Sequence, residues 1–267
     1  MVLLLTLVAG IMLAVMIERN TAQVAATQRE LDAYTFAHAT RGLGDALDAW
    51  TKFYPRTPIA ELLDEDGRAF TITVERGQQV TVHLIDGQGL ALANLTGLSQ
   101  ANVRTGREVL RHLREDTGDK APMFVREDGP LAVSVNTAPL EVLEAVLAAV
   151  SGDESGSGLV TDLVARRDAE GLIDPQALQT AIDQSALSPE HKNRAKALLT
   201  ANPALWRVHA RASGADGRGT GVAYRGWAII TRGATVASGD RAAAVQRSVA
   251  IFGWERVESN DEADRRN

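Results

Sequence analysis

The chain has 267 residues, of which 45% are hydrophobic and 23% are charged, and its formal net charge is −6. This composition excludes a disordered protein and supplies enough apolar residues for one or two globular domains. The acidic balance argues against nucleic acid as the main partner, because phosphate binding depends on clustered lysines and arginines, and the absence of cysteine excludes disulfides, thiolate metal sites and cysteine nucleophiles.

The chain opens with seventeen residues that carry no charge, and Glu18 and Arg19 are the first charged side chains. As a helix this segment would be roughly 25 Å long, slightly shorter than the roughly 30 Å hydrocarbon core of a bilayer. A secretion signal would begin with a basic region, and no lysine or arginine precedes Arg19. We therefore expect a membrane anchor or the packing surface of an assembly rather than a discarded signal.

An amphipathic helix is predicted to follow without a break. No proline occurs from Asn20 to Trp50, and apolar side chains recur at spacings near three, four and seven, namely Val24, Leu31, Tyr34, Leu43, Leu47 and Trp50. The two segments together predict one helix of about fifty residues, roughly 75 Å long, that ends near Pro55 and Pro58. A helix that is apolar all round in its first half and one-sided in its second resembles a pilin stem.

A β-hairpin and a short helix are predicted next. Residues 69–76 and 79–86 alternate apolar and polar positions and are rich in threonine and valine, as in paired strands. Gly87 and Gly89 then predict a turn before an apolar run. Residues 107–116 have the apolar spacing of a short helix.

A run of short helices is predicted between Pro130 and Pro203. Three helix starts share an N-cap residue that a proline follows: Thr137 with Pro139, Asp174 with Pro175, and Ser188 with Pro189. Glu141 occupies an early position that favours an acid. These starts predict a compact helical subdomain.

Strand-like alternation returns in residues 204–256, with glycine-rich turns at 214–221 and 233–239. This pattern predicts three strands of an antiparallel meander. The last residues, 257–267, contain almost no apolar side chain and are predicted to be a disordered tail.

The sequence contains no pattern typical of catalysis. Its five histidines are scattered without a metal-binding pair, and no Gly-x-Ser-x-Gly elbow is present. Gly217, Gly219 and Gly221 precede a strand pattern, whereas a dinucleotide loop must open a helix. We therefore expect no enzyme, no catalytic residue and no cofactor.

Two stretches carry a resemblance to a known family. Residues 82–95, VHLIDGQGLALANL, join a strand to an Asp turn and a Leu-Asn run, and residues 133–147, VSVNTAPLEVLEAVL, have the spacing of helix-hairpin-helix relatives. With the element order, they are similar to the minor pseudopilin K family of type II secretion systems, also called general secretion pathway protein K. The residues that carry the resemblance are Asp86, Asn94, Asn136, Thr137, Pro139 and Leu140.

The resemblance implies an α+β fold in which a long N-terminal pilin-like helix precedes an antiparallel β-sheet head. An all-α insertion, SAM-like or helix-hairpin-helix-like, would interrupt the sheet. The implied boundaries are a stem at 1–54, the first part of the head at 55–98, the insertion at 99–203, the second part of the head at 204–256 and a tail at 257–267.

The resemblance also implies a role in assembly, without any bond made or broken. The protein would sit at the tip of a pseudopilus and initiate or cap the assembly that exports folded proteins across the outer membrane. It would span the inner membrane once, with its head in the periplasm, and its partners would be I-type and J-type minor pseudopilins and the inner-membrane secretion assembly. Leu4, Leu7, Ile11 and Val15 would contact lipid and neighbouring stems, and Leu31, Tyr34, Leu43 and Trp50 would hold the lower stem to the head.

The absence of an acid before Glu18 agrees with the resemblance. Most pilin-like subunits carry a glutamate at the fifth mature position, whereas K subunits usually have an apolar or neutral residue there. A buried stem glutamate is costly unless it meets the N-terminal amine of the subunit ahead, so a subunit with nothing ahead can dispense with it. No basic leader precedes Met1, and we expect either a start upstream of Met1 or a stem anchored without processing.

Two ligand hypotheses stay open. The resemblance implies calcium in the helical insertion, where Asp153, Glu154 and Asp162 are candidates, although their spacing matches no calcium motif and solvated loop acids are the favoured interpretation. The alternative function is a membrane-tethered helix-hairpin-helix protein for DNA binding or uptake. The net charge and the two acids at 153 and 154, where a phosphate would bind, oppose it.

Overall fold

The computed structural model describes residues 2–74, 77–152, 156–213, 219–234 and 245–258, without the side chains of residues 1–15 and 17 and of a few positions beside the gaps. The chain is an α+β protein with a long N-terminal helix and an antiparallel sheet. It divides into two compact units, Met1–Ala49 and Trp50–Asn267.

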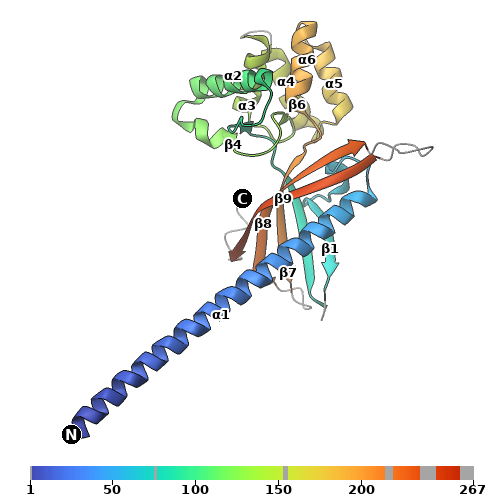
Figure 1. The fold of residues 1–267 in the computed structure, drawn as a ribbon. Helices are drawn as coiled ribbons and strands as arrows, with labels where there is room; N and C mark the ends of the chain where they lie inside the picture. Colours follow the sequence, from blue (N-terminus) through green and yellow to red (C-terminus); the bar gives the residue numbers. More distant parts are fainter. Residues whose placement is uncertain (1, 75–76, 153–155, 214–218, 235–244, 259–267) are drawn as a thin grey trace. The chain divides into compact units, whose positions relative to one another are not determined.

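Helix α1 (Val2–Phe53) continues without a break for 52 residues (Figure 1), and its residues up to Ala49 make up the described part of the first unit. The predicted long N-terminal helix is confirmed, and it ends just before Pro55 because a proline disfavours the helical conformation of the residue that precedes it. Among the residues described, no helix has an apolar stretch long enough to cross a membrane.

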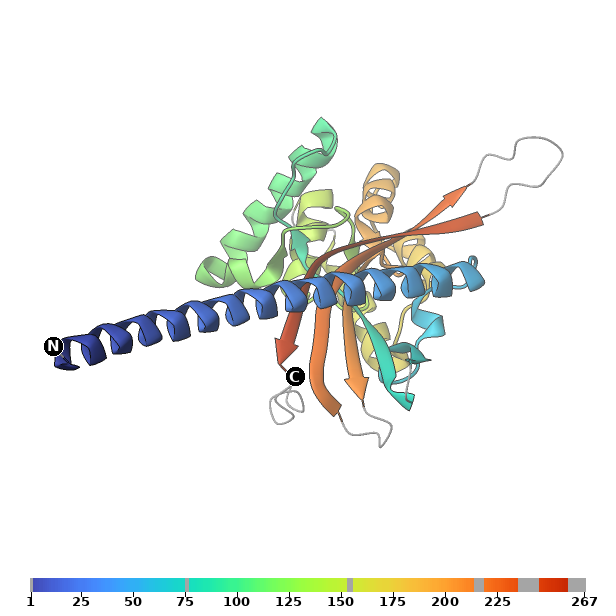
Figure 2. The same cartoon turned by 60° about the horizontal axis from the view of Figure 1, so that its bottom comes forward.

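The second unit contains a five-stranded antiparallel sheet with the strand order β1-β2-β7-β8-β9 (Figures 1 and 2). Its strands are β1 (Arg68–Thr73), β2 (Gln79–Asp86), β7 (Leu205–Ser213), β8 (Gly219–Ala234) and β9 (Val245–Glu258). The predicted hairpin is confirmed as β1 and β2, and the predicted meander as β7, β8 and β9.

Two details of the predicted strands are wrong. β8 already includes Gly219, Gly221 and Gly233, which were assigned to turns, and β9 extends to Glu258, into the predicted tail. Pairing with a neighbouring strand holds these residues extended, as in the Val222–Glu258 and Gly233–Gln246 pairs. The rest of the predicted tail, residues 259–267, and most of the two predicted turns lie outside the described residues.

The helical part of the chain is inserted between two neighbouring strands of the sheet. β2 and β7 pair along their whole length, from Gln79 with Ser213 to Asp86 with Trp206. The chain therefore leaves the sheet after Asp86 and returns to it next to Asp86, at Trp206. The point of departure lies before residue 99, at which the sequence analysis expected the insertion to begin.

The described residues of the insertion form six helices and four very short strands. The helices are α2 (Gln100–Thr117), the 3₁₀ helix η3 (Gly118–Phe124), α3 (Leu140–Ser151), α4 (Ser157–Glu170), α5 (Pro175–Gln184) and α6 (Pro189–Leu198). The strands pair in parallel, β3 (Ala91–Leu92) with β4 (Val125–Arg126) and β5 (Val133–Ser134) with β6 (Leu199–Thr200). A separate 3₁₀ helix, η1 (Ala60–Leu62), follows α1.

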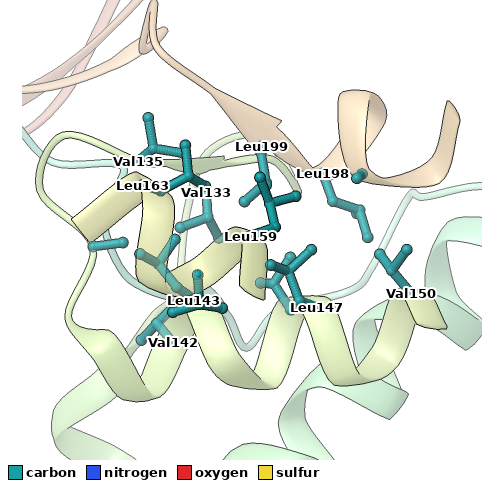
Figure 3. Close-up of a cluster of buried hydrophobic side chains, with 14 of the residues drawn as sticks. Val133, Val135, Val142, Leu143, Leu147, Val150, Leu159, Leu163, Leu198 and Leu199 are labelled. Carbon is teal, nitrogen blue, oxygen red and sulfur yellow. The ribbon is translucent and has the colours of Figure 1, made fainter. Parts of the chain in front are cut away.

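The core of the insertion is built around α3, whose sequence LEVLEAVLAAVS is apolar on most of its circumference. A helix of this kind has to be covered on all sides. Leu143 and Leu147 are completely buried, and Leu159 and Leu163 of α4 lie against them (Figure 3).

Helix capping follows the sequence at two predicted starts and departs from it at two others. Asp174 caps α5 through bonds from the backbone N–H groups of Gln176 and Ala177, and Ser188 caps α6. Thr137 does not cap α3, because its side chain hydrogen-bonds Asp86 and Pro139 is the N-cap residue. α2 begins at Gln100, before the predicted residue 107, because Ser99 caps it.

A leucine truncation at the centre of the insertion core should destabilise the protein strongly. Leu143→Ala removes a side chain that is 0% exposed, and the lost burial together with the cavity should cost about 2–5 kcal/mol. Leu140→Ala is the matched control in the same helix, because Leu140 is 46% exposed and should cost less than about 0.5 kcal/mol. Urea unfolding followed by circular dichroism measures both, and equal losses would contradict this account of the core.

Candidate functional site

A cluster of polar side chains lies where the chain leaves and re-enters the sheet, and it includes Asp86 and Asn136 of the two family-like stretches. We call this cluster the joint and define it by five polar side chains from β2, its following turn, β4, β5 and the segment after β5: Asp86, Gln88, Arg126, Ser134 and Asn136. Gln88, Arg126 and Ser134 are buried. A buried polar group is costly unless it is hydrogen-bonded, so the partners of these side chains decide what the joint does.

Asp86 is the last residue of β2, and its carboxylate accepts hydrogen bonds from two sides. The backbone N–H of Gln88 donates to Oδ1 at 2.8 Å, and the Ser134 hydroxyl donates to Oδ2 at 2.5 Å. Burial raises the pKa of Asp86, although the bonds from Ser134, Gln88 and Thr137 and the charge of Arg126 act in the opposite direction. The carboxylate thus connects the end of β2 to β5.

Gln88 is only 2% exposed, and its side-chain amide bonds three backbone groups. Nε2 donates to the carbonyl of Ala132 at 2.8 Å. Oε1 accepts from the N–H groups of Ala204 at 2.7 Å and Leu205 at 3.1 Å. One side chain therefore ties the outgoing chain to the segment before β5 and to the start of β7.

Arg126 is 6% exposed and donates to backbone carbonyls of the surrounding loop. Nε donates to Leu90 at 2.9 Å, Nη1 to Asp128 at 2.5 Å, and Nη2 to Pro130 and to Ala132. Burial lowers the pKa of Arg126 to about 10, against the raising influence of Asp86 and Asp128. The guanidinium is therefore protonated at neutral pH and orders the chain between β4 and β5.

Asn136 extends the joint into the helical part. Its Oδ1 accepts from the N–H of Ile173 at 2.8 Å, and its Nδ2 donates to the carbonyls of Ile173 at 3.1 Å and Ala201 at 3.4 Å. The two bonds with Ile173 pair the side-chain amide with the backbone just before α5. The next residues are held by Arg167, whose Nη1 donates to the carbonyl of Ala138 at 2.7 Å.

Two glycines of the turn after β2 allow the close approaches in the joint. A Cβ atom at Gly87 would lie 2.5 Å from the Trp227 ring, and one at Gly89 would lie 2.6 Å from the carbonyl oxygen of Thr137. Neither contact leaves room for a side chain. Glycine is therefore needed at both positions for close packing, in addition to its role in the turn that the sequence predicted.

The other family-like residues lie outside the joint. Asn94 is exposed, and its Oδ1 accepts from the N–H of Thr96 at 3.1 Å, as in a turn. Pro139 ends the segment before α3, and Leu140 is the first, largely exposed residue of that helix.

The residues expected along the stem are spread over both units of the chain. The side chains of Leu4, Leu7, Ile11 and Val15 lie outside the described residues. Leu31 and Tyr34 are 56% and 63% exposed, and the Tyr34 ring lies 4.2 Å from that of His38. Their expected packing against the head stays a prediction. Leu43 is buried, and the Trp50 ring lies 5.7 Å from that of Phe70 within the second unit.

The calcium hypothesis stays a prediction. Asp153 and Glu154 lie outside the described residues. Arg166 Nε donates to the carboxylate of Asp162 at 2.9 Å. Within the described ranges, no three histidine, aspartate or glutamate side chains are placed to share a metal ion.

Sequence reasoning missed Gln88, Arg126 and Ser134 as joint residues. Gln88 gave a usable signal, because it is a polar residue between two glycines inside a quoted motif. Arg126 gave none, because an isolated arginine is usually a solvated side chain.

Comparison with known proteins gives a structural similarity only. No protein-family model matches the chain, and no curated protein matches its sequence. It is similar to a chain of the crystal structure of the GspK-GspI-GspJ complex from the type 2 secretion system of enterotoxigenic Escherichia coli, with 11% sequence identity and a TM-score of 0.46. The similarity covers 89% of this chain and 100% of that chain, and at this identity it does not assign the chain to a family.

Replacing Gln88 by methionine should unfold or severely destabilise the second unit. Methionine keeps the volume but leaves the N–H groups of Ala204 and Leu205 without their partner and removes one of the two donors to the carbonyl of Ala132. Because each buried unsatisfied group costs about 1–3 kcal/mol, Gln88→Met should lose at least about 2 kcal/mol in chemical unfolding. Gln184→Met, at an exposed position, is the control, and a similar stability of the two variants would refute the joint's role.

Asp86 should make a pH-dependent contribution to stability. Its pKa is raised in the folded chain from the ordinary 3.8, so the folded state holds the proton to a higher pH than the unfolded state. The contribution is fully present below 3.8 and is lost as the pH rises through the folded pKa. The difference in unfolding free energy between the natural chain and Asp86→Asn should therefore shrink from acid to neutral pH.

Urea titrations at several pH values measure this difference for Asp86→Asn. Asp116→Asn, at an exposed position of α2, controls for the loss of one carboxylate. A difference that stays constant or grows with pH would show that burial of Asp86 does not control its titration.

Proposed function

We propose that this protein is a non-enzymatic subunit of a type II secretion pseudopilus, of the minor pseudopilin K kind. The observation that carries the proposal is the order of the elements. A single 52-residue helix, whose first seventeen residues in the chain are uncharged, leads into an antiparallel sheet with a helical insertion between β2 and β7. This order agrees with the one that the sequence resemblance implies.

The chemistry of the joint supports a role in assembly rather than in catalysis. The side chains of Gln88, Arg126 and Asn136 direct their polar atoms at backbone groups of their own chain. Groups engaged in this way stabilise the connection between sheet and insertion. They are not presented to a substrate, as catalytic groups have to be.

The position in the assembly is part of the proposal. No acid precedes Glu18, and a stem without an acid suits a subunit that has no other subunit ahead of it. The proposed role is therefore to initiate or cap the pseudopilus, with I-type and J-type minor pseudopilins as partners. The proposed location is the inner membrane, with the apolar start of α1 as the anchor and the second unit in the periplasm.

Loss of the gene should stop export in the source bacterium. The folded substrates of type II secretion should then accumulate in the periplasm, and the full chain should restore their export. A Leu7→Arg chain should not restore it, because with the start of α1 as the proposed anchor the new charge would lie in the hydrocarbon layer, where it costs about 2.5–3.5 kcal/mol. Glu18→Gln, at the end of the uncharged segment, is the control and should restore export.

Fractionation and copurification test the anchor and the partners. The full chain should be extracted only by detergent, together with the I-type and J-type subunits, whereas a chain that begins at Thr27 should be soluble. Full-length protein in a periplasmic wash, or normal export in its absence, would overturn the proposed function.

A further inference from the structure

Helix α2 carries four arginines on one face. Arg104, Arg107, Arg111 and Arg114 follow one another at spacings of three, four and three residues, and all four are exposed. Residues at these spacings lie on the same side of a helix. Val109 and Leu113 are buried, on the other side of the helix, so the arginines form a row on the exposed face of α2.

Two of the four arginines already have acidic partners. Arg104 pairs with Glu108 at 3.3 Å, and Arg111 pairs with Glu115 at 2.9 Å. In the described part of the chain no ion pair is made by Arg107 or Arg114. These two lie seven residues apart, so their Cα atoms are about 10 Å apart along the helix axis.

The arginine row borders two hollows with apolar walls. The first has a volume of about 720 Å³ and includes Leu110, Pro122 and Val125 in its lining, and the second has a volume of about 550 Å³ and includes Leu98 and Val103. Arg107 and Arg111 line both hollows, so the two hollows lie next to each other. We call the two hollows together the α2 groove.

We propose that the α2 groove binds an acidic segment of a partner protein. Two carboxylates of the segment pair with Arg107 and Arg114, and apolar side chains between them contact Leu110 and its neighbours. A polyproline II segment advances about 3.1 Å per residue and returns to the same side every three residues, so two acids three residues apart match the spacing of the two arginines and point the same way. The proposal goes beyond the role in the pseudopilus and does not depend on it.

The same groove is less suited to nucleic acid or to a lipid surface. Its lining contains no aromatic side chain on which a base could stack. Glu108, Glu115 and Asp119 also belong to the lining and would repel a row of phosphates. A short segment with two acids can place them at the unpaired arginines and keep them away from these carboxylates, and this favours a protein partner.

The test uses the full chain in detergent and a fluorescent peptide, Gly-Ser-Glu-Leu-Val-Glu-Ser-Gly, in fluorescence anisotropy. The natural chain should bind it, and binding should weaken as NaCl rises from about 50 to about 500 mM. The double variant Arg107→Gln with Arg114→Gln should bind about tenfold more weakly, because two exposed ion pairs are lost. Arg29→Gln with Arg194→Gln removes two exposed charges outside the groove and should bind normally.

A charge exchange tests the pairing itself. Arg107→Glu with Arg114→Glu should reject the peptide and bind the version in which lysines replace both glutamates. Equal binding of the natural chain to a version with glutamines, or no loss in the Arg107→Gln, Arg114→Gln variant, would overturn the proposal. Binding of duplex DNA or of vesicles containing phosphatidylglycerol, through the same two arginines and without peptide binding, would also overturn it.

Discussion

The connection between the sheet and the helical insertion depends on the buried amide of Gln88. An insertion between two paired strands brings the outgoing and the returning chain together in the interior, where backbone groups without partners are costly. Gln88 supplies partners to Ala132 on one segment and to Ala204 and Leu205 on the other. The pairing of β2 with β7, and with it the centre of the sheet, requires that these groups be satisfied.

The other residues of the joint extend the hydrogen-bond network of Gln88. Asp86 and Ser134 connect the end of β2 to β5, Arg126 orders the loop before β5, and Asn136 reaches the start of α5. The polar network therefore separates two apolar regions, the face of the sheet and the core around α3.

Local signals in the sequence predicted much of the fold. The long helix follows from the absence of proline before Pro55, and the caps at Asp174 and Ser188 follow from residues next to the helices they start. Thr137 was misassigned because a bond to the distant Asp86 competes with the local cap. The joint could not be predicted from local sequence signals for the same reason, because Gln88 and its partner Ala204 are 116 residues apart.

Native-state hydrogen exchange at Ala204 and Leu205 tests the central role of Gln88 most directly. Ala204 comes just before β7 and Leu205 is the first residue of that strand, and at such a position an N–H without a strong partner exchanges through local opening. If the Gln88 side chain holds them, their N–H groups should exchange only with global unfolding, at the same free energy as the central residues of β7 such as Val208. Rapid exchange at Ala204 and Leu205, while Val208 stays protected, would contradict the account.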